Sequence, residues 1–275
     1  MRFKNTLGCG YHPDTYHAIK KHAQLADKVS WERVREELNK IILSEHAAVA
    51  FEDFQDTGVL PYVLPELESC KGVAQPPEYH HEGDVWTHLM DSLKSLPTNA
   101  TLSSRWAVIF HDIGKPETFK IGERIRFDKH SEVSAEIAER IMRRLKFPRK
   151  DIDRVTWTVK HHFMMKQLLE MPIGRQRYWF LHEYFPDLLM LFYADAAGTT
   201  PKDLSLYNDV KVAYENCLKH FSEIPKALLS GVEIMELLHL PAGPTIGEIL
   251  DKLMEKQLSH EIKTKAEALS WLKNF

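Results

Sequence analysis

The chain has 275 residues, a formal net charge of -3 and a pI near 6.6, so its overall charge does not indicate a nucleic-acid-binding protein. Its 44% hydrophobic content allows a sizeable core, and no run of 18 apolar residues predicts a membrane span. Cys9, Cys70 and Cys217 are odd in number and far apart, which fits a reducing compartment better than a disulfide scaffold. The first residues lack the apolar core of a signal peptide. We therefore expect a cytoplasmic protein of one large or two modest domains.

Apolar residues recur at helical spacing along nearly the whole chain. The segments that show this spacing are, in order, 16–23, 31–41, 48–54, 85–96, 105–110, 130–145, 152–159 and 186–192, with further helices from about residue 208. Asp84 predicts a helix start, as do the capping-box pairs Ser230/Glu233 and Thr264/Glu267. Residues 61–77 have no clear period and predict a connection, and residues 119–127 alternate as in a short hairpin. The sequence predicts an all-α, multi-helix fold with room for one β-hairpin.

One stretch stands out, Ile109-Phe110-His111-Asp112-Ile113-Gly114-Lys115, at the end of an apolar segment. Gly114 and Pro116 predict the end of that helix. An imidazole and a carboxylate delivered into an apolar interior need a partner, because an unpaired buried charge is costly. A metal ion would satisfy both groups. The alternative is a capped helix end with a solvated aspartate.

Projection at 100° per residue places more polar side chains on or beside the apolar helix faces. Together with the His-Asp doublet, six metal-type ligands point inward from five helices: His88, His111, Asp112, His130, His162 and Asp195. His161 projects away from the face that carries His162. A single inward histidine is more often a satisfied core residue, and an ion pair with arginine is the alternative for Asp195. The complete set favours a metal site, because mixed His/Asp ligands suit divalent ions.

The order of His88, the His111-Asp112 doublet and Asp195 resembles the HD phosphohydrolase superfamily, in which these positions bind a divalent metal. The resemblance implies that His130 and His162 correspond to the extra histidines of members that hold a second metal, with Asp112 as the bridge. Members that act on cyclic dinucleotides carry Gly-Tyr-Pro after a paired histidine. Here Phe163-Met164-Met165 follows instead, which disfavours that subclass.

A narrower resemblance covers nearly the whole chain. The stretches from Gly72 to His88, from Ser30 to Leu38 and from Gly231 to Gly247 resemble the HD region, neck helix and tail of bacterial CCA-adding tRNA nucleotidyltransferases and poly(A) polymerases. It implies a neck-like region over residues 1–70, an HD domain over 71–205 and a helical tail over 206–275. The Gly-Ser and paired aspartates of the nucleotide-adding head are not found before Arg2-Phe3. We therefore expect this chain alone not to add nucleotides to tRNA.

Basic residues supply candidate contacts to phosphate. Lys115 is close to the doublet and could neutralise a phosphate, the alternative being a solvated lysine at a helix end. Arg175 and Arg177 are candidate substrate-binding residues, and structural roles are equally compatible with the pattern. The basic segment from Arg140 to Arg154 is interrupted by acidic residues, so it is modest support for RNA contact and is more often a solvated face.

The sequence thus favours a metal-dependent phosphohydrolase that acts on a nucleotide or an RNA-end phosphate. A 2′,3′-cyclic phosphodiesterase or phosphatase fits the resemblance best, with one or two divalent transition-metal or magnesium ions. We assign Asp112 and Lys115 to catalysis and Lys115, Arg175 and Arg177 to substrate binding. The alternative is a non-catalytic tRNA-binding module that partners a separate nucleotidyltransferase head. No membrane contact is expected, and the oligomeric state is left open.

Overall fold

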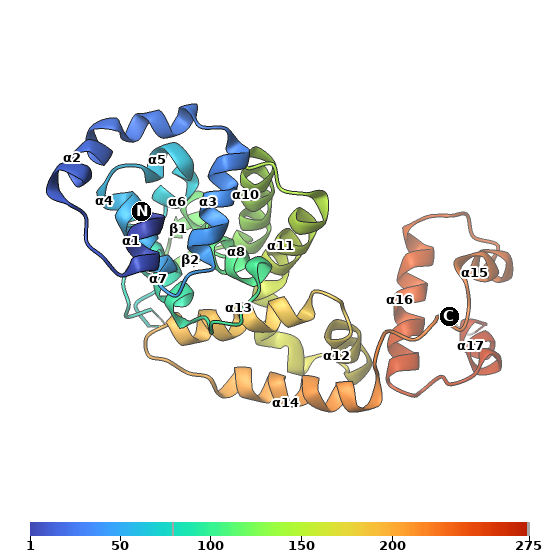
Figure 1. Cartoon of the computed structure of the whole chain (residues 1–275). Helices are drawn as coiled ribbons and strands as arrows, with labels where there is room; N and C mark the ends of the chain where they lie inside the picture. Colours follow the sequence, from blue (N-terminus) through green and yellow to red (C-terminus); the bar gives the residue numbers. More distant parts are fainter. Residues whose placement is uncertain (79, 274–275) are drawn as a thin grey trace. The chain divides into compact units, whose positions relative to one another are not determined.

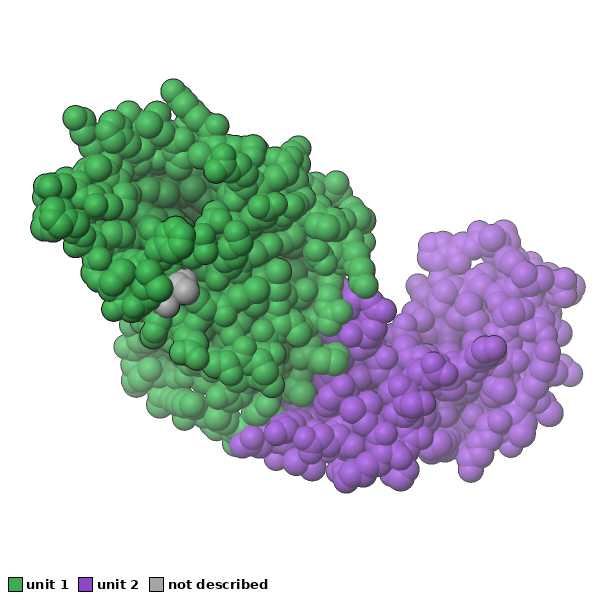
Figure 2. Space-filling model, viewed as in Figure 1, with its two compact units in different colours: residues 1–163, 186–207 green, residues 164–185, 208–275 purple. Residues whose placement is uncertain are grey.

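A computed structural model describes residues 1–78 and 80–273 of the chain. The predicted all-α fold with one short hairpin is confirmed (Figure 1). The chain divides into two compact units, which are coloured separately in Figure 2. Unit 1 comprises Met1–Phe163 and Pro186–Tyr207, and unit 2 comprises Met164–Phe185 and Asn208–Phe275. The division into neck, HD and tail regions stays a prediction. Tyr79, which falls within the stretch from Gly72 to His88, lies outside the described residues.

Unit 1 consists of helices with one antiparallel hairpin in which Phe119 lies opposite Phe127. Its elements are α1 (Arg2–Leu7), α2 (Pro13–His22), the 3-10 helix η1 (Ala23–Lys28), α3 (Trp31–Ile42), α4 (Ala47–Asp56), α5 (Leu60–Val63), α6 (Pro65–Glu68), α7 (Val85–Ser95), α8 (Leu102–Phe110), α9 (Lys115–Thr118), β1 (Phe119–Ile121), β2 (Ile125–Phe127), α10 (His130–Arg144), α11 (Arg149–His161) and nearly all of α13 (Phe185–Gly198).

Helices are the regular secondary structure of unit 2 among its described residues. It contains most of the 3-10 helix η2 (His162–Glu170) and of α14 (Ser205–His220), together with α12 (Ile173–Phe180), α15 (Gly231–Leu238), α16 (Pro244–Leu258) and α17 (Lys265–Leu272). Leu229, Ile234, Ile249 and Leu253 belong to a separate buried core formed by its last helices. In the part of the chain that is described, no helix combines the length and apolar character needed to cross a membrane.

Several helices begin where the sequence predicts. The side chain of Asp84 accepts a hydrogen bond from the first turn of α7, and both capping boxes, at Ser230/Glu233 and Thr264/Glu267, are formed. The predicted connection over residues 61–77 differs, because it contains most of α5 and all of α6. Each of these helices is a single turn with proline in its first turn, and a single turn is too short to show a helical period.

Helix α8 lies in the centre of unit 1 and carries the doublet at its end. Seven of its nine residues are buried, and it ends at Phe110, ahead of Gly114. The guanidinium of Arg105 is buried and donates to the carbonyl oxygens of Ala100, Ile42, Pro97 and Thr98. A buried charge with several hydrogen-bond partners holds its surroundings in one arrangement. The start of α8 is thereby fixed to the end of α3 and to the loop before α8.

Asp187 joins α8 to two further helices that carry site residues. Its buried carboxylate accepts hydrogen bonds from the hydroxyls of Thr101 and Ser104 at the start of α8, and Arg154 of α11 pairs with its second oxygen. Asp187 itself belongs to the first turn of α13. The helices α8, α11 and α13 share this one carboxylate, and this contact fixes their mutual positions. Breaking it would leave a buried charge without a partner, which is strongly destabilising.

Two glycines permit close helix crossings beside the site. A Cβ atom on Gly198 of α13 would lie 2.4 Å from the backbone nitrogen of Ser92 of α7, and one on Gly114 would lie 2.6 Å from the backbone nitrogen of Ser134 of α10. Gly198 is three residues after Asp195, and Ser92 is four residues after His88, so the first crossing places a turn of each helix beside the other. This close approach is what brings Asp195 to His88.

We expect Gly198→Ala to destabilise unit 1 by about 1–3 kcal/mol, because the added methyl group overpacks a backbone contact. The measurement is the free energy of unfolding in denaturant. Gly122→Ala is the matched control, since a Cβ there meets nothing within 4 Å. Equal stabilities of the two variants would contradict the role assigned to the close crossing.

Candidate metal centre

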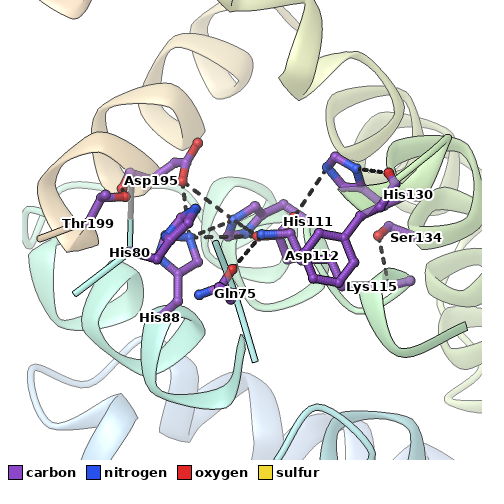
Figure 3. A network of polar contacts seen from close by, with 12 residues as sticks. Gln75, His80, His88, His111, Asp112, Lys115, His130, Ser134, Asp195 and Thr199 are labelled. Atoms are coloured by element: carbon purple, nitrogen blue, oxygen red, sulfur yellow. Dashed lines mark hydrogen bonds and ion pairs between the residues drawn. The ribbon is translucent and has the colours of Figure 1, made fainter. Parts of the chain in front are cut away.

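Four imidazoles from four helical elements converge in unit 1, and Figure 3 labels three of them, His88, His111 and His130. Each of the four has its Nδ1 atom held by an acceptor. The acceptors are Glu82 Oε1 for His88 (3.0 Å) and the carbonyl oxygens of Val108, Phe127 and Val159 for His111, His130 and His162 (2.8, 2.9 and 2.7 Å). A carbonyl oxygen only accepts hydrogen bonds, so these Nδ1 atoms carry hydrogen. In the neutral rings the Nε2 atoms are then left with their lone pairs, which is the form in which histidine binds metals.

The free Nε2 atoms face one another in two pairs. His88 and His111 approach to 3.2 Å, and His130 and His162 approach to 3.3 Å. Two lone pairs at such a distance repel, so each pair requires a proton or a cation between or beside its nitrogen atoms. All four side chains are nearly or completely buried, so bulk water cannot solvate the nitrogen atoms and relieve this repulsion. The donor set therefore fits a bound cation near each pair.

Two carboxylates complete the arrangement. Asp195 Oδ1 lies 3.0 Å from His88 Nε2 and 3.8 Å from His111 Nε2. Asp112 faces both pairs, with Oδ2 3.3 Å from His111 Nε2 and Oδ1 3.4 Å from His130 Nε2 and 3.8 Å from His162 Nε2. Three groups of ligand atoms have the proximity that a metal ion needs: His88, His111 and Asp195; Asp112, His130 and His162; and His80, Glu82 and His88. The first two contain the six ligands that the sequence predicts.

The pKa shifts follow the same division. Burial by itself would lower the pKa of His88, but hydrogen bonds with Asp195 and Glu82 outweigh it and raise that pKa to about 9. Burial and the neighbouring His111 lower the pKa of His162 to about 3. Burial would raise the pKa of Asp112, yet the charge of Lys115 and contact with His111 hold it well below its usual range. The raised pKa of His88 favours a positive charge on its ring, and the lowered pKa of Asp112 keeps that carboxylate ionised.

Lys115 is buried rather than solvated, and it neutralises Asp112. Its Nζ atom lies 2.6 Å from Asp112 Oδ2 and 2.6 Å from Gln75 Oε1, and it lies over the ring of Phe127 at 5.2 Å from the centroid. An ammonium group with a carboxylate, an amide oxygen and an aromatic face around it is held in one position. Its placement orients the carboxylate that the two histidine pairs share.

Glu82 forms a second layer behind His88. Its Oε1 atom accepts from His88 Nδ1 at 3.0 Å and lies 2.6 Å from His80 Nδ1, while Oε2 accepts from the backbone nitrogen of Thr200 at 2.8 Å. Burial would raise the pKa of Glu82, but these hydrogen bonds lower it to about 2. A carboxylate on the far nitrogen of a ligand histidine fixes the tautomer and the ring orientation.

The structure brings together all six predicted ligands and Lys115, whereas the two predicted substrate-binding arginines belong to unit 2. There, Arg175 pairs with Glu255 at 2.6 Å, and Arg177 donates to the carbonyl oxygen of Leu258 at 2.6 Å. Their binding of substrate, like the metal-binding and catalytic roles of the other residues, stays a prediction.

Three polar residues around the site could not be identified as site residues from the sequence: Gln75, His80 and Glu82. They precede α7, in a segment without helical period, so no helical projection applies to them. The closely spaced imidazoles and carboxylate at residues 80–82 were the available signal.

The basic segment before and within α11 is occupied by ion pairs. The pairs are Arg140–Glu117, Arg143–Glu139, Arg144–Glu66, Arg149–Asp153 and Arg154–Asp187. Arg154 and Arg144 are partly buried and join separate elements, while the others are exposed. This pairing favours a structural role for much of the segment over contact with RNA.

Comparison with protein families gives two matches, to "Probable RNA and SrmB-binding site of polymerase A" over residues 11–71 and to the HD domain over residues 79–196. The chain is 36% identical to an A-adding tRNA nucleotidyltransferase of Deinococcus radiodurans and 34% identical to a CC-adding tRNA nucleotidyltransferase of Thermus thermophilus. These matches cover 100% and 99% of this chain, but only 66% and 64% of the relatives.

A solved structure shares the fold. It is the crystal structure of the Bacillus stearothermophilus CCA-adding enzyme in complex with CTP, which matches 99% of this chain and 59% of its own with a TM-score of 0.66 at 20% identity. The resemblance to the neck, HD and tail region that the sequence indicated is confirmed.

We expect the adjacent histidines of α11 and η2 to differ sharply. His162→Ala removes a Nε2 atom from the pair with His130, so it should lower metal stoichiometry by about one ion if two are bound. His161→Ala should change stoichiometry little, because its Nδ1 atom bonds to the carbonyl oxygen of Trp157, within its own helix. Elemental analysis of purified protein gives the measurement. A stoichiometry near one in the wild type would make His162 a supporting residue, and greater sensitivity of His161 would overturn the assignment.

Glu82→Gln should weaken metal binding by about 10–100-fold, the range typical of partners that hold a ligand histidine. The amide loses the charge and also places an N–H donor toward His80, His88 or Thr200. Affinity is measured by competition with a chromophoric chelator, which requires no catalysis. Glu78→Gln, an exposed change in the same segment, is the control. Equal metal affinities of the two variants would rule out the orienting role.

Proposed function

Because the chain carries an HD domain that follows a polymerase A-type RNA-binding region, we propose that it is a metal-dependent phosphohydrolase. The chain is homologous to the neck, HD and tail region of the CCA-adding tRNA nucleotidyltransferases. Its substrate is a phosphate ester of a nucleotide or of an RNA end, with a 2′,3′-cyclic phosphodiester or terminal phosphomonoester as the reacting group. The relatives' names refer to nucleotide addition, so the hydrolase is a proposal about this region alone.

The observation that carries the proposal is the pairing of Nε2 lone pairs around one ionised carboxylate. His88, His111 and Asp195 would hold one ion, and His130 with His162 would hold a second, with Asp112 between them. A divalent ion bound there lowers the pKa of a bound water and polarises a phosphoryl oxygen. Inert core histidines account poorly for the set, because four buried imidazoles would not need to present their acceptor nitrogens to one another.

The chain's own residues supply position and charge. Asp112 stays ionised in the buried site because Lys115 lies 2.6 Å from its Oδ2 atom. Lys115 in turn is held by Gln75, so the ammonium charge is available beside the reacting phosphate without leaving its carboxylate. Asp195 is the most exposed of these groups, with a side chain 20% exposed, which places the entry for substrate on its side of the first histidine pair.

The RNA-binding match over residues 11–71 supports an RNA end, including that of tRNA, over a free nucleotide. The same match supports a second candidate, a non-catalytic RNA-binding module that acts with a separate nucleotidyltransferase head. The names of the relatives favour this second function. The two candidates differ in what they require of the metal centre, because binding alone needs no ionised Asp112.

We expect hydrolysis of a 2′,3′-cyclic nucleotide or of a 3′-phosphorylated oligonucleotide to require a divalent metal. Chelation should abolish it, and Asp112→Ala should lower kcat by more than about 100-fold, beyond the loss typical of outer partners. Asp153→Ala is the control, since this half-buried aspartate pairs with Arg149 and has no contact with the four histidines among its ion pairs. Circular dichroism verifies folding. Full turnover in chelated protein and in Asp112→Ala would refute the hydrolase proposal.

A further inference from the structure

His80 precedes α7 and is joined to the metal centre by a shared carboxylate. Its Nδ1 atom lies 2.6 Å from Glu82 Oε1, the atom that also accepts from His88 Nδ1 at 3.0 Å. The His80 ring meets the His88 ring edge to face, with 5.2 Å between centroids. Figure 3 shows these two rings and Asp195 at the end of the polar network away from His130. His80 therefore lies beside the first histidine pair, on the side where the substrate is proposed to enter.

Backbone contacts hold the loop that carries His80. The backbone nitrogen of His81 donates to the carbonyl oxygen of Thr200 at 2.8 Å, and the backbone nitrogen of Thr200 donates in turn to Glu82 Oε2, also at 2.8 Å. Thr200 follows α13, the helix that carries Asp195. The loop before α7 and the end of α13 are thus held together, so the same contacts that orient Glu82 also position His80.

The second ring nitrogen of His80 is available to a ligand. The pKa of Glu82 is lowered to about 2, so this carboxylate is ionised and only accepts, and the hydrogen of a neutral His80 ring is on Nδ1. Nε2 then carries a lone pair and points away from Glu82, because the two nitrogen atoms lie on different edges of the ring. Among residues 1–78 and 80–273, no group makes a hydrogen bond to this Nε2 atom. The His80 side chain is 16% exposed, so a substrate can reach it.

A bound cation among His80, Glu82 and His88 is a second explanation for this cluster, since their ligand atoms lie within 4.8 Å of one another. The Glu82 carboxylate already accepts from both rings and from the backbone of Thr200, so it needs no cation. Burial and the positive charge of Lys115 both lower the pKa of His80, so the ring lies within electrostatic reach of that ammonium group. A further cation at this position would add repulsion, which favours a neutral ligand for Nε2.

A lone pair on Nε2 selects the kind of substrate atom that can bind to it. The oxygen atoms of an ionised phosphate carry no hydrogen, so they repel an acceptor nitrogen. A sugar hydroxyl does carry hydrogen, and the 2′-hydroxyl is the group by which proteins distinguish RNA from DNA. In a 3′-phosphorylated ribose, this hydroxyl is on the carbon next to the one that bears the phosphate. A reacting phosphate therefore brings a hydrogen-bond donor with it only when its sugar is ribose.

We propose that His80 makes the site specific for ribose, because its Nε2 atom accepts a hydrogen bond from the hydroxyl next to the reacting phosphate. The inference rests on the proposed function and narrows its preferred substrate class to phosphomonoesters at a ribonucleotide end, in which that hydroxyl is free. In a 2′,3′-cyclic phosphodiester both oxygen atoms are esterified, so such an end gains no bond from His80. A deoxyribose end lacks the donor and gains none either.

The test uses the full chain with His80→Asn at about pH 8, above the ordinary pKa of histidine. The asparagine amide keeps an N–H donor for Glu82 and removes Nε2. Two RNA octamers with a 3′-phosphate are compared, one that ends in ribose and one that ends in 2′-deoxyribose. The wild type should hydrolyse the ribose end with a kcat/KM about 10-fold higher, which is the effect of one hydrogen bond. His80→Asn should bring that ratio to about one by lowering the ribose value alone.

Equilibrium binding of the same two octamers, fluorescently labelled, separates this contact from catalysis. It is measured in an Asp112→Ala background, in which we expect turnover to be too slow to consume them. The ribose end should bind about 10-fold more tightly, and adding His80→Asn should remove the difference. His81→Asn is the matched control, because His81 is exposed and contacts Thr200 through its backbone. This control should keep the ratio of its parent protein.

A ratio near one in the wild type, an unchanged ratio in His80→Asn, or no binding of either octamer would each overturn the inference. An equal loss on both ends in His80→Asn would overturn it as well, because His80 would then only support Glu82. A ribose preference in binding that depends on His80, without hydrolysis by the wild-type chain, would keep this contact and reject the hydrolase. Hydrolysis without a ribose preference would keep the hydrolase and reject the role of His80.

Discussion

The candidate site of unit 1 is arranged around one buried carboxylate, that of Asp112. A carboxylate removed from water is stable only when opposite charge and hydrogen-bond donors replace the water. Lys115 supplies a fixed charge to Oδ2, and Nε2 atoms of both histidine pairs lie within 3.8 Å of the carboxylate oxygens. Since these imidazoles present acceptor nitrogens, they do not donate to the carboxylate in their neutral form. The remaining positive charge must come from a proton or a metal ion, and this requirement gives the site its chemistry.

The scaffold delivers these groups by contacts that leave little freedom. Asp187 joins α8, α11 and α13, and each of these helices carries a predicted ligand at or just beyond its C-terminal end. The backbone nitrogen of Gly114 donates to the hydroxyl of Ser134 at 2.9 Å, which fixes the turn after the doublet against α10. Close backbone crossings of this kind transmit even a one-methyl change, because packed interiors have no space to absorb it. The candidate ligands come from five separate helices, so their convergence requires this precision.

Two residues, Glu82 and Phe127, connect the candidate ligands to neighbouring segments on opposite sides of the site. On one side, Glu82 holds His88 and also accepts from the backbone of Thr200, so a single carboxylate links the loop before α7 to the residues that follow α13. On the other side, Phe127 links Lys115 and His130 to the base of the hairpin. The first contact holds the ring of His88, and the second holds the ring of His130 and the ammonium group of Lys115.

The sequence by itself predicted the longer helices and the six candidate ligands, because these depend on local spacing, and its resemblance to known relatives indicated the family. Helical period shows which side chains face inward, and Asp84 or Ser230 marks a helix start through bonds made within one turn. It did not reveal Glu82 and Gln75, whose positions in a non-periodic segment acquire meaning only when that segment packs against α7 and α9. Lys115 could equally have been solvated, and only the fold buries it between Asp112 and Gln75. Tertiary structure decided how the Nε2 atoms pair and placed one carboxylate between both pairs. Helix phase could not show this, because it gives the direction of a side chain but not the distance between helices.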